Sequence, residues 1–343
     1  MTRTAVVVCP GRGTYNKDEL GYLGRHHADE KDLLAAFDAI RAGMGQPPIT
    51  ALDAAERFSA ATYTRGDVAS PLIYAASLAD ARSLAGDIDV VAVTGNSMGW
   101  YIALAVAGAV SALDGFRVVN TMGTLMQEHM IGGQLVYPFV DEQWRADVGR
   151  RQELLAAVVA IDARDGCSLS LSIDLGGMLV LAGNEAGLDA FEASQPRLND
   201  RFPLRLPNHA AFHTALQAPV SEQGRERLGT VRIGQPLRPI IDGRGHVWWP
   251  GATDRKALRE YTLGHQVTEA YDFTRAIQSA AREFAPDLFI VTGPGNTLGG
   301  AVAQSLIFCE WNGMKSRADF ESRQSQSPLL VSMGRQEQRS LVI

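Results

Sequence analysis

The chain has 343 residues, of which 46% are hydrophobic and 20% charged, and its formal net charge is −6. This composition is typical of a globular protein with one large core or two domains. It argues against a nucleic-acid surface, which needs clustered Lys and Arg, and against a membrane protein, since no segment approaches the ~18–20 apolar residues of a span.

Three apolar runs rich in β-branched residues predict buried strands, at residues 5–9, 88–94 and 288–292. Each run leads into a glycine-containing turn and then into helical periodicity, which is the α/β pattern. The turns are PGRG at 10–13, GNSMG at 95–99 and GPG at 293–295. Ligands of α/β sheets bind at the carboxyl ends of the strands. We therefore expect the three turns to share one crevice.

The middle of the chain has a different order of elements. Strands are predicted at 134–140, 167–173, 178–182 and 202–206, with helices at 142–160 and 185–194. The resulting order, βαββαβ, is that of a ferredoxin-like unit. We predict an α/β fold in which an α/β-hydrolase-like large domain with a parallel sheet core comprises residues 1–131 and 205–343. An inserted ferredoxin-like subdomain comprises residues 132–204.

The three cysteines are widely spaced and form no CxxC pair: Cys9, Cys167 and Cys309. This spacing indicates free thiols in a reducing compartment, and neither a disulfide frame nor a zinc site. We therefore expect a cytoplasmic protein that binds no metal.

The turn at 95–99 fits the pattern G-x-S-x-G, with Ser97 at its centre. In this pattern the serine occupies a sharp strand-to-helix turn, and the N–H that follows it points at a substrate oxyanion. The pentapeptide alone is a weak signal in a chain with 34 glycines. The preceding strand and the following helix favour Ser97 as a nucleophile.

A serine nucleophile needs a base within hydrogen-bonding distance. Five of the seven histidines stand in polar, loop-like surroundings and are expected to be exposed: His26, His27, His129, His246 and His265. His209 and His213 follow a predicted strand, and spacing alone does not choose between them. It also names no carboxylate partner.

Six short motifs occur in an order that is typical of one enzyme family. Residues 10–13 resemble PGQG, 95–100 resemble GHSxGE and 122–128 resemble RGxLMQE. Residues 211–216 resemble AFHSxLM, Gln266 and Phe273 have the spacing of Q-x(6)-W/F, and 292–298 resemble EVGPGxVL. From residue 5 to about residue 306 the chain thus resembles the malonyl-CoA:acyl-carrier-protein transacylases, which include the acyltransferase domains of polyketide and fatty-acid synthases.

The resemblance implies roles for particular residues. Ser97 would attack an acyl-CoA thioester and hold the acyl group, and His213 would be its base, oriented by the main-chain carbonyl of Gln266. The N–H groups of Arg12 and Met98 would form the oxyanion hole. The phosphopantetheine thiol of an acyl carrier protein would accept the acyl group. No cofactor is implied.

Departures from the family pattern fall near the acyl group. Met122 replaces the arginine that pairs with the malonyl carboxylate, so the acyl group is expected not to be malonyl unless another cation substitutes. Arg12 replaces a glutamine and either supplies that cation or points to solvent. Asn96 replaces His and Trp100 replaces Glu, and we expect both to contact substrate, together with Phe212.

Two alternatives to acyl transfer remain. The first is an acyl-CoA or acyl-carrier-protein hydrolase, in which water releases the acyl group from Ser97. The second is a non-catalytic module that binds a carrier protein.

Overall fold

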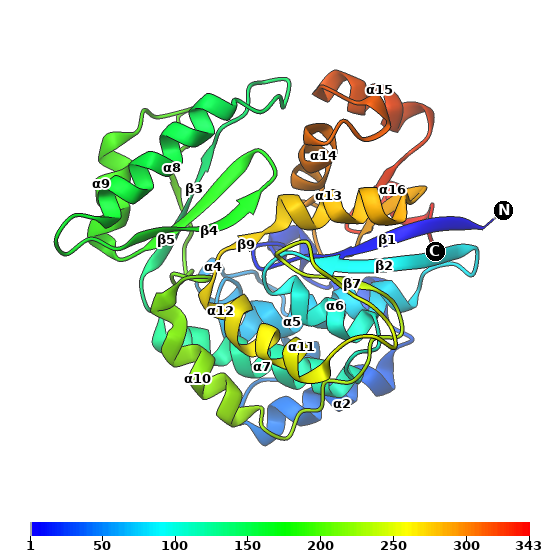
Figure 1. The fold of residues 1–343 in the computed structure, drawn as a ribbon. Helices are drawn as coiled ribbons and strands as arrows, with labels where there is room; N and C mark the ends of the chain where they lie inside the picture. Colours follow the sequence, from blue (N-terminus) through cyan, green and yellow to red (C-terminus); the bar gives the residue numbers. More distant parts are fainter. Residues whose placement is uncertain (1) are drawn as a thin grey trace.

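The computed structural model describes residues 2–343, in which the strands form two sheets (Figure 1). The larger sheet has the order β11-β10-β1-β2-β7-β8, and all neighbours are parallel except β7 and β8. Its strands are β1 (Arg3–Cys9), β2 (Ile88–Gly95), β7 (Ile240–Ile241), β8 (Val247–Trp248), β10 (Leu288–Val291) and β11 (Leu330–Ser332). The three strands predicted from apolar runs are β1, β2 and β10, and the predicted α/β fold is confirmed.

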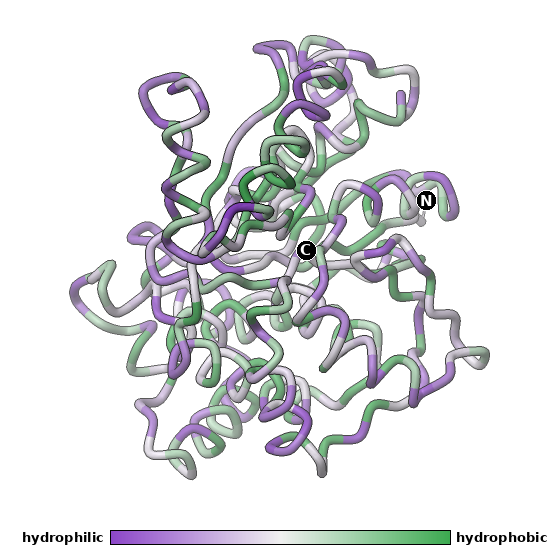
Figure 2. The backbone as a smooth tube through the Cα atoms, turned by 60° about the vertical axis from the view of Figure 1, so that its left-hand side comes forward, coloured by the Kyte–Doolittle hydropathy of each residue, from purple (hydrophilic) through white to green (hydrophobic). Residues whose placement is uncertain are grey.

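Helices cover both faces of this sheet, so its central strands are apolar on both sides. In β1, residues 5–9 are fully buried. One face carries α5 (Gly66–Arg82), α6 (Gly99–Val106) and α7 (Ala112–His129), and the other carries α13 (Phe273–Phe284) and α14 (Gly299–Phe308) (Figure 1). Figure 2 shows hydrophobic stretches in the interior and hydrophilic stretches along the outer helices and loops.

The second sheet has the order β6-β3-β5-β4-β9. It comprises β3 (Gly133–Pro138), β4 (Leu169–Leu175), β5 (Met178–Gly183), β6 (Leu204–Arg205) and β9 (Tyr271–Asp272). The helices α8 (Val148–Asp162) and α9 (Glu185–Ser194) pack against it around a separate apolar cluster. Because β9 lies outside the proposed insertion and pairs with β4, it ties the two sheets together. The division into domains stays a prediction.

The remaining elements are short or peripheral. They are α1 (Tyr22–His26), α2 (Lys31–Gly43), α3 (Ile49–Asp53), α4 (Ala60–Tyr63), α10 (Ala218–Arg227), α11 (Arg255–Glu260), α12 (Gln266–Thr268), α15 (Arg317–Gln326) and α16 (Gln336–Arg339). Single turns lie at η1 (Lys17–Glu19), η2 (Ala215–Gln217), η3 (Tyr261–His265) and η4 (Trp311–Gly313). Within residues 2–343, no helix is both long enough and apolar enough to cross a membrane.

The start of α8 differs from the sequence prediction. The helix begins at Val148 and not at residue 142, because the Asp147 side chain caps it by accepting the N–H of Arg150. The residues before it form a turn in which Asp141 accepts the N–H groups of Gln143 and Arg145. Local side-chain hydrogen bonds of this kind compete with helix formation.

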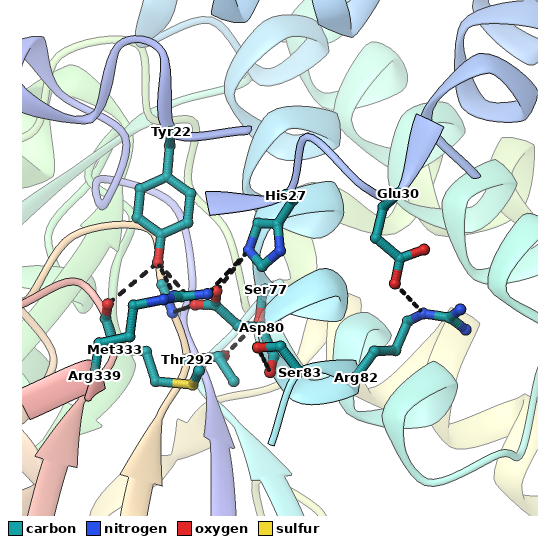
Figure 3. Close-up of polar contacts among 11 residues, drawn as sticks. Tyr22, His27, Glu30, Ser77, Asp80, Arg82, Ser83, Thr292, Met333 and Arg339 are labelled. Carbon is teal, nitrogen blue, oxygen red and sulfur yellow. Dashed lines mark hydrogen bonds and ion pairs between the residues drawn. The ribbon is translucent and has the colours of Figure 1, made fainter. Parts of the chain in front are cut away.

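A buried polar cluster joins distant parts of the chain (Figure 3). Asp80 on α5 accepts hydrogen bonds from the Tyr22 hydroxyl, at 2.8 Å, and from Arg339 Nη1 on α16, at 2.5 Å, and contacts His27 Nε2 at 2.7 Å. Burial alone would raise the pKa of Asp80, but its bonds to His27 and Arg339 outweigh burial and lower it. The C-terminal segment is therefore held against α5 by a buried ion pair.

The prediction that five histidines are exposed is largely wrong. His27 is 1% exposed, because it takes part in the Asp80 cluster. Of the other four, His246 is exposed, and His26, His129 and His265 are half-buried.

Candidate active site

Ser97 lies on the sharp turn between β2 and α6. Its backbone φ is +55°, a left-handed conformation that residues other than glycine rarely adopt. The flanking glycines leave room for the turn: a Cβ on Gly95 would lie 2.2 Å from the backbone of Gly99, and a Cβ on Gly99 would lie 2.2 Å from the carbonyl oxygen of Cys9. The sequence pattern G-x-S-x-G thus corresponds to a strained turn with Ser97 at its apex.

His213 is the histidine next to Ser97. The Ser97 Oγ lies 2.7 Å from His213 Nε2, and His213 Nδ1 lies 2.7 Å from the main-chain carbonyl oxygen of Gln266. A carbonyl oxygen only accepts hydrogen bonds, so Nδ1 carries the proton and Nε2 is left to accept the Ser97 hydroxyl proton. His209 is directed elsewhere, with Nδ1 2.9 Å from the Pro207 carbonyl oxygen.

Burial keeps His213 neutral. Desolvation lowers the pKa of His213 to about 4, and its hydrogen bond to the Gln266 carbonyl offsets only part of this effect. A neutral imidazole at neutral pH can take up a proton, which is what a general base requires. Both the position of His213 Nε2 beside Ser97 and the neutral state of its ring suit a general base.

Gln266 has contacts besides its carbonyl group. Its side chain donates to the Ser97 carbonyl oxygen at 3.0 Å and accepts from the Tyr101 hydroxyl at 2.8 Å. It directly follows the π-helical turn η3. Sequence analysis missed Tyr101, although its position four residues after Ser97, one helical turn along α6, is a usable signal. It also missed Tyr271, whose hydroxyl donates to the Gly95 carbonyl oxygen at 2.5 Å.

The turns that follow β1 and β2 lie side by side. A Cβ on Gly11 would lie 2.7 Å from the Asn96 carbonyl oxygen, so the two backbones are in direct contact there. Neither the N–H of Arg12 nor that of Met98 donates a hydrogen bond to another group in residues 2–343. Both N–H groups are therefore free to donate to a substrate oxygen.

A small cavity opens beside Ser97. Its volume is about 20 Å³, enough for roughly one water molecule. Most of its wall is apolar, and within residues 2–343 Arg12 is the only Lys or Arg that lines it. The lining residues are Arg12, Ser70, Ser97, Met98, Tyr101, Val119, Met122, Gly123, Met126, Phe212, His213, Gln266 and Val267.

The Arg12 side chain does not extend into solvent. Its Nη2 donates to the carbonyl oxygens of Thr64, at 2.5 Å, and Asn208, at 2.8 Å, and its guanidinium carbon lies 5.4 Å from the centre of the Phe212 ring. Its Nε is buried and has no partner in residues 2–343. Burial lowers the pKa of Arg12 to about 10, so the group is charged at neutral pH.

Two residues expected to contact substrate do not line the cavity. Trp100 is fully buried on the side of α6 that faces η3, where its Nε1 donates to Thr262 Oγ1 at 3.1 Å and its ring packs edge-on against Tyr261. The neighbouring Tyr101 faces the cavity, because successive helical residues point about 100° apart. Asn96 is also buried and packs against Gly11. By contrast, Met122 and Phe212 line the cavity, as expected of residues that contact substrate.

The His, Cys, Asp and Glu side chains of the described residues were the candidates for a metal site. In the part of the chain that the structure describes, residues 2–343, no group of three or more His, Cys, Asp or Glu side chains is arranged to hold a metal ion. The polar groups around Ser97 are instead suited to proton transfer and to binding an oxyanion.

The chain is similar in sequence to several proteins of known function. No protein-family model matches it. The malonyl CoA-acyl carrier protein transacylase of Salmonella typhimurium is 25% identical over 206 residues, which is 60% of this chain and 63% of that protein. A non-reducing polyketide synthase of Cercospora beticola is 27% identical over 279 residues, which is 80% of this chain and 12% of the synthase. The chain is a homologue of malonyl-CoA:acyl-carrier-protein transacylases.

Solved structures share the fold of this transacylase homologue. The acyl-carrier-protein S-malonyltransferase of Burkholderia pseudomallei has a TM-score of 0.76 at 22% identity, and the match covers 99% of both chains. A malonyl-transacylase in complex with a type II polyketide synthase acyl-carrier protein has a TM-score of 0.72 at 20% identity, covering 89% of this chain and 93% of that one. The sequence matches to the bacterial transacylases span just under two thirds of those proteins.

Proposed function

We propose that this transacylase homologue transfers an acyl group from acyl-CoA to the phosphopantetheine thiol of an acyl carrier protein, through an ester on Ser97. The observation that carries the proposal is the chain of contacts from Ser97 Oγ to His213 Nε2 and from His213 Nδ1 to the Gln266 carbonyl oxygen, each 2.7 Å long. The proposal includes a cytoplasmic location, which suits the free thiols of the three cysteines.

The first half-reaction forms the acyl-enzyme. Ser97 Oγ attacks the thioester carbonyl carbon while His213 Nε2 takes the hydroxyl proton. The carbonyl oxygen becomes an oxyanion that accepts hydrogen bonds from the N–H groups of Arg12 and Met98. The C–S bond then breaks, and His213 returns its proton to the departing CoA thiolate. The neutral His213 needed for the first step is supplied by its burial.

The second half-reaction is the same chemistry in reverse. The carrier-protein thiol gives its proton to His213 and attacks the Ser97 ester, the C–O bond breaks, and the proton goes to Ser97 Oγ. Every proton moves through one imidazole nitrogen, so no cofactor is needed. The two substrates use the same cavity in turn, and kinetics should be ping-pong.

We further propose that the acyl group is neutral. Met122 brings no charge to the cavity wall, and an unpaired carboxylate buried there would cost several kcal/mol. Arg12 is a poor two-pronged partner, because its Nη2 already donates to the carbonyl oxygens of Thr64 and Asn208. Nε and Nη1 have no hydrogen-bond partner in residues 2–343, but both two-pronged faces of a guanidinium include Nη2, so each can donate only singly, and a single N–H is weaker than a fork.

Acceptor dependence tests the proposal. The protein is incubated with acetyl-CoA, with and without a holo-acyl carrier protein. Free CoA, free acetate and the acetylated form of the carrier protein are measured. Acyl transfer requires that release of the acyl group depends on the acceptor. Rapid acetate formation without the acceptor contradicts transfer and indicates a hydrolase. A folded protein that binds carrier protein but never releases CoA indicates a non-catalytic module.

A further inference from the structure

Helix α10 carries a buried glycine, Gly224, that lies against the cavity-lining residue Met122. We propose that Gly224 and Met122 together form the end wall of the acyl cavity and restrict Ser97 to a two-carbon, acetyl-sized group. This inference rests on the proposed function and adds to it the size of the acyl group and a second residue that sets it.

Met122 forms the wall between the cavity and helix α10. It is 1% exposed and lines the cavity, and its Sδ lies against Gly224 of α10. A Cβ on residue 224 would lie 2.6 Å from Met122 Sδ and 3.3 Å from its Cε, which is too close for either atom to stay in place. The end of the Met122 side chain therefore occupies space that exists only because residue 224 is glycine.

The backbone of α10 gives no other reason for glycine at this position. Gly224 is buried inside the helix and is not among the glycines with positive φ. Glycine within a helix is less favourable than alanine, since it loses more conformational freedom on folding. The close approach of Met122 is the one contact that requires the missing side chain.

The size of the cavity then indicates the size of the acyl group. In the proposed mechanism the acyl group is held on Ser97, which lines the cavity of about 20 Å³. A methyl group is about the size of a water molecule and fits such a space, whereas each further methylene has to displace Met122 or Met126. One extra methylene in a hydrophobic pocket typically costs about 10- to 200-fold in kcat/KM.

Two variants and their combination test this pair. Met122→Ala opens the end wall, and we expect kcat/KM for butyryl-CoA relative to acetyl-CoA to rise at least tenfold. Gly224→Ala pushes the end of Met122 into the cavity, and we expect acetyl loading to fall by about tenfold. In the double variant the alanine at 224 has no methionine to displace, so adding it to Met122→Ala should change acetyl loading less than about twofold. Tenfold is the lower end of the cost of one methylene, and butyryl has two methylenes more than acetyl.

Gly43→Ala is the matched control, because Gly43 also lies in a helix and a Cβ there would meet nothing within 4 Å. It should leave both the butyryl-to-acetyl ratio of kcat/KM and the level of acetyl loading unchanged. Two results would overturn the inference but leave the proposed function standing, provided that acyl-Ser97 still forms. One is an unchanged butyryl-to-acetyl ratio of kcat/KM in Met122→Ala. The other is a loss of acetyl loading from Gly224→Ala that is the same whether residue 122 is methionine or alanine. A wild-type protein that takes no acyl group from any acyl-CoA overturns both.

Discussion

At the scale of single residues, the site depends on backbone groups as much as on side chains. His213 is oriented by the Gln266 carbonyl oxygen, 2.7 Å away, and not by a carboxylate. A carbonyl oxygen fixes the tautomer without adding a negative charge, so it raises the pKa of His213 less than an aspartate would. This explains why no acidic partner could be named from the sequence.

The two neighbouring histidines should differ sharply in importance. His213→Ala removes the base for Ser97 and should slow acylation about 10²–10⁴-fold. His209→Ala should change it little, because within residues 2–343 the one hydrogen bond of the His209 ring goes to the Pro207 carbonyl oxygen and none goes to Ser97. Stopped-flow release of CoA measures both. Equal losses, or a larger loss from His209→Ala, would mean that the wrong histidine has been assigned.

Acylation should keep its rate to unusually low pH. The base form of His213 is lost only as the pH falls through its pKa, which burial lowers to about 4. The acylation rate constant should therefore be constant from neutral pH down to about pH 5 and fall below that, whereas an unperturbed histidine titrates near 6.5. Single-turnover acylation rates measured across this pH range test the prediction. A decline in rate centred near pH 6.5 would contradict the assignment of His213 as a buried, neutral base.

The acyl preference should follow the charge at position 122. Wild-type protein should load acetyl-CoA with a higher kcat/KM than malonyl-CoA, and Met122→Arg should shift that ratio toward malonyl by roughly tenfold or more, the scale of one charge-assisted hydrogen bond. Competition between the two substrates measures the ratio. If wild-type protein loads malonyl at least as well as acetyl, Arg12 becomes the carboxylate partner, and Arg12→Ala should then abolish malonyl loading.

At the scale of elements, the pattern of apolar residues predicted the strands that position the site. It could not predict which side chains of the following helix face the cavity. Residues 5–9 of β1, all of β10 and the second half of β2 are buried on both faces, so their apolar composition identifies them. Which side of α6 faces the cavity depends on how that helix packs. Trp100 was therefore expected to contact substrate, although Tyr101 lines the cavity.

Element boundaries depend on local hydrogen bonds that composition does not reveal. The helix predicted from residue 142 starts at Val148, because Asp141 and Asp147 hold the preceding backbone in a turn and a cap. The contact between Gly224 on α10 and Met122 on α7 is likewise set by the distance between two helices, and no pattern along the chain indicates it.

At the scale of the whole molecule, the Asp80 cluster connects segments that are far apart in sequence. Asp80 also accepts the N–H of Gly293 at 2.6 Å, so it joins the turn after β10 to α5, α16 and the N-terminal segment. Such contacts form only when the complete fold brings their residues together. That is why His27 was expected to be exposed and is buried.

Removing Arg339 should destabilise the whole fold. Arg339→Leu leaves the Asp80 carboxylate buried without its cation and should lower the free energy of unfolding by about 3–5 kcal/mol. Arg335→Leu is the control, since Arg335 is exposed and its loss should cost less than about 0.5 kcal/mol. Urea unfolding followed by circular dichroism measures both, and equal small effects would contradict a stabilising role for the cluster.

The central claim is that Ser97 carries the acyl group during transfer. Intact-mass measurement of the protein after brief incubation with acetyl-CoA, in wild type and in Ser97→Ala, tests it most directly, because the acyl ester adds the mass of one acetyl group. We predict a single acetyl increment on wild-type protein that disappears on addition of a holo-carrier protein, and no increment on a folded Ser97→Ala variant. An increment of the same size that persists in Ser97→Ala would place the acyl group on another residue and contradict the account.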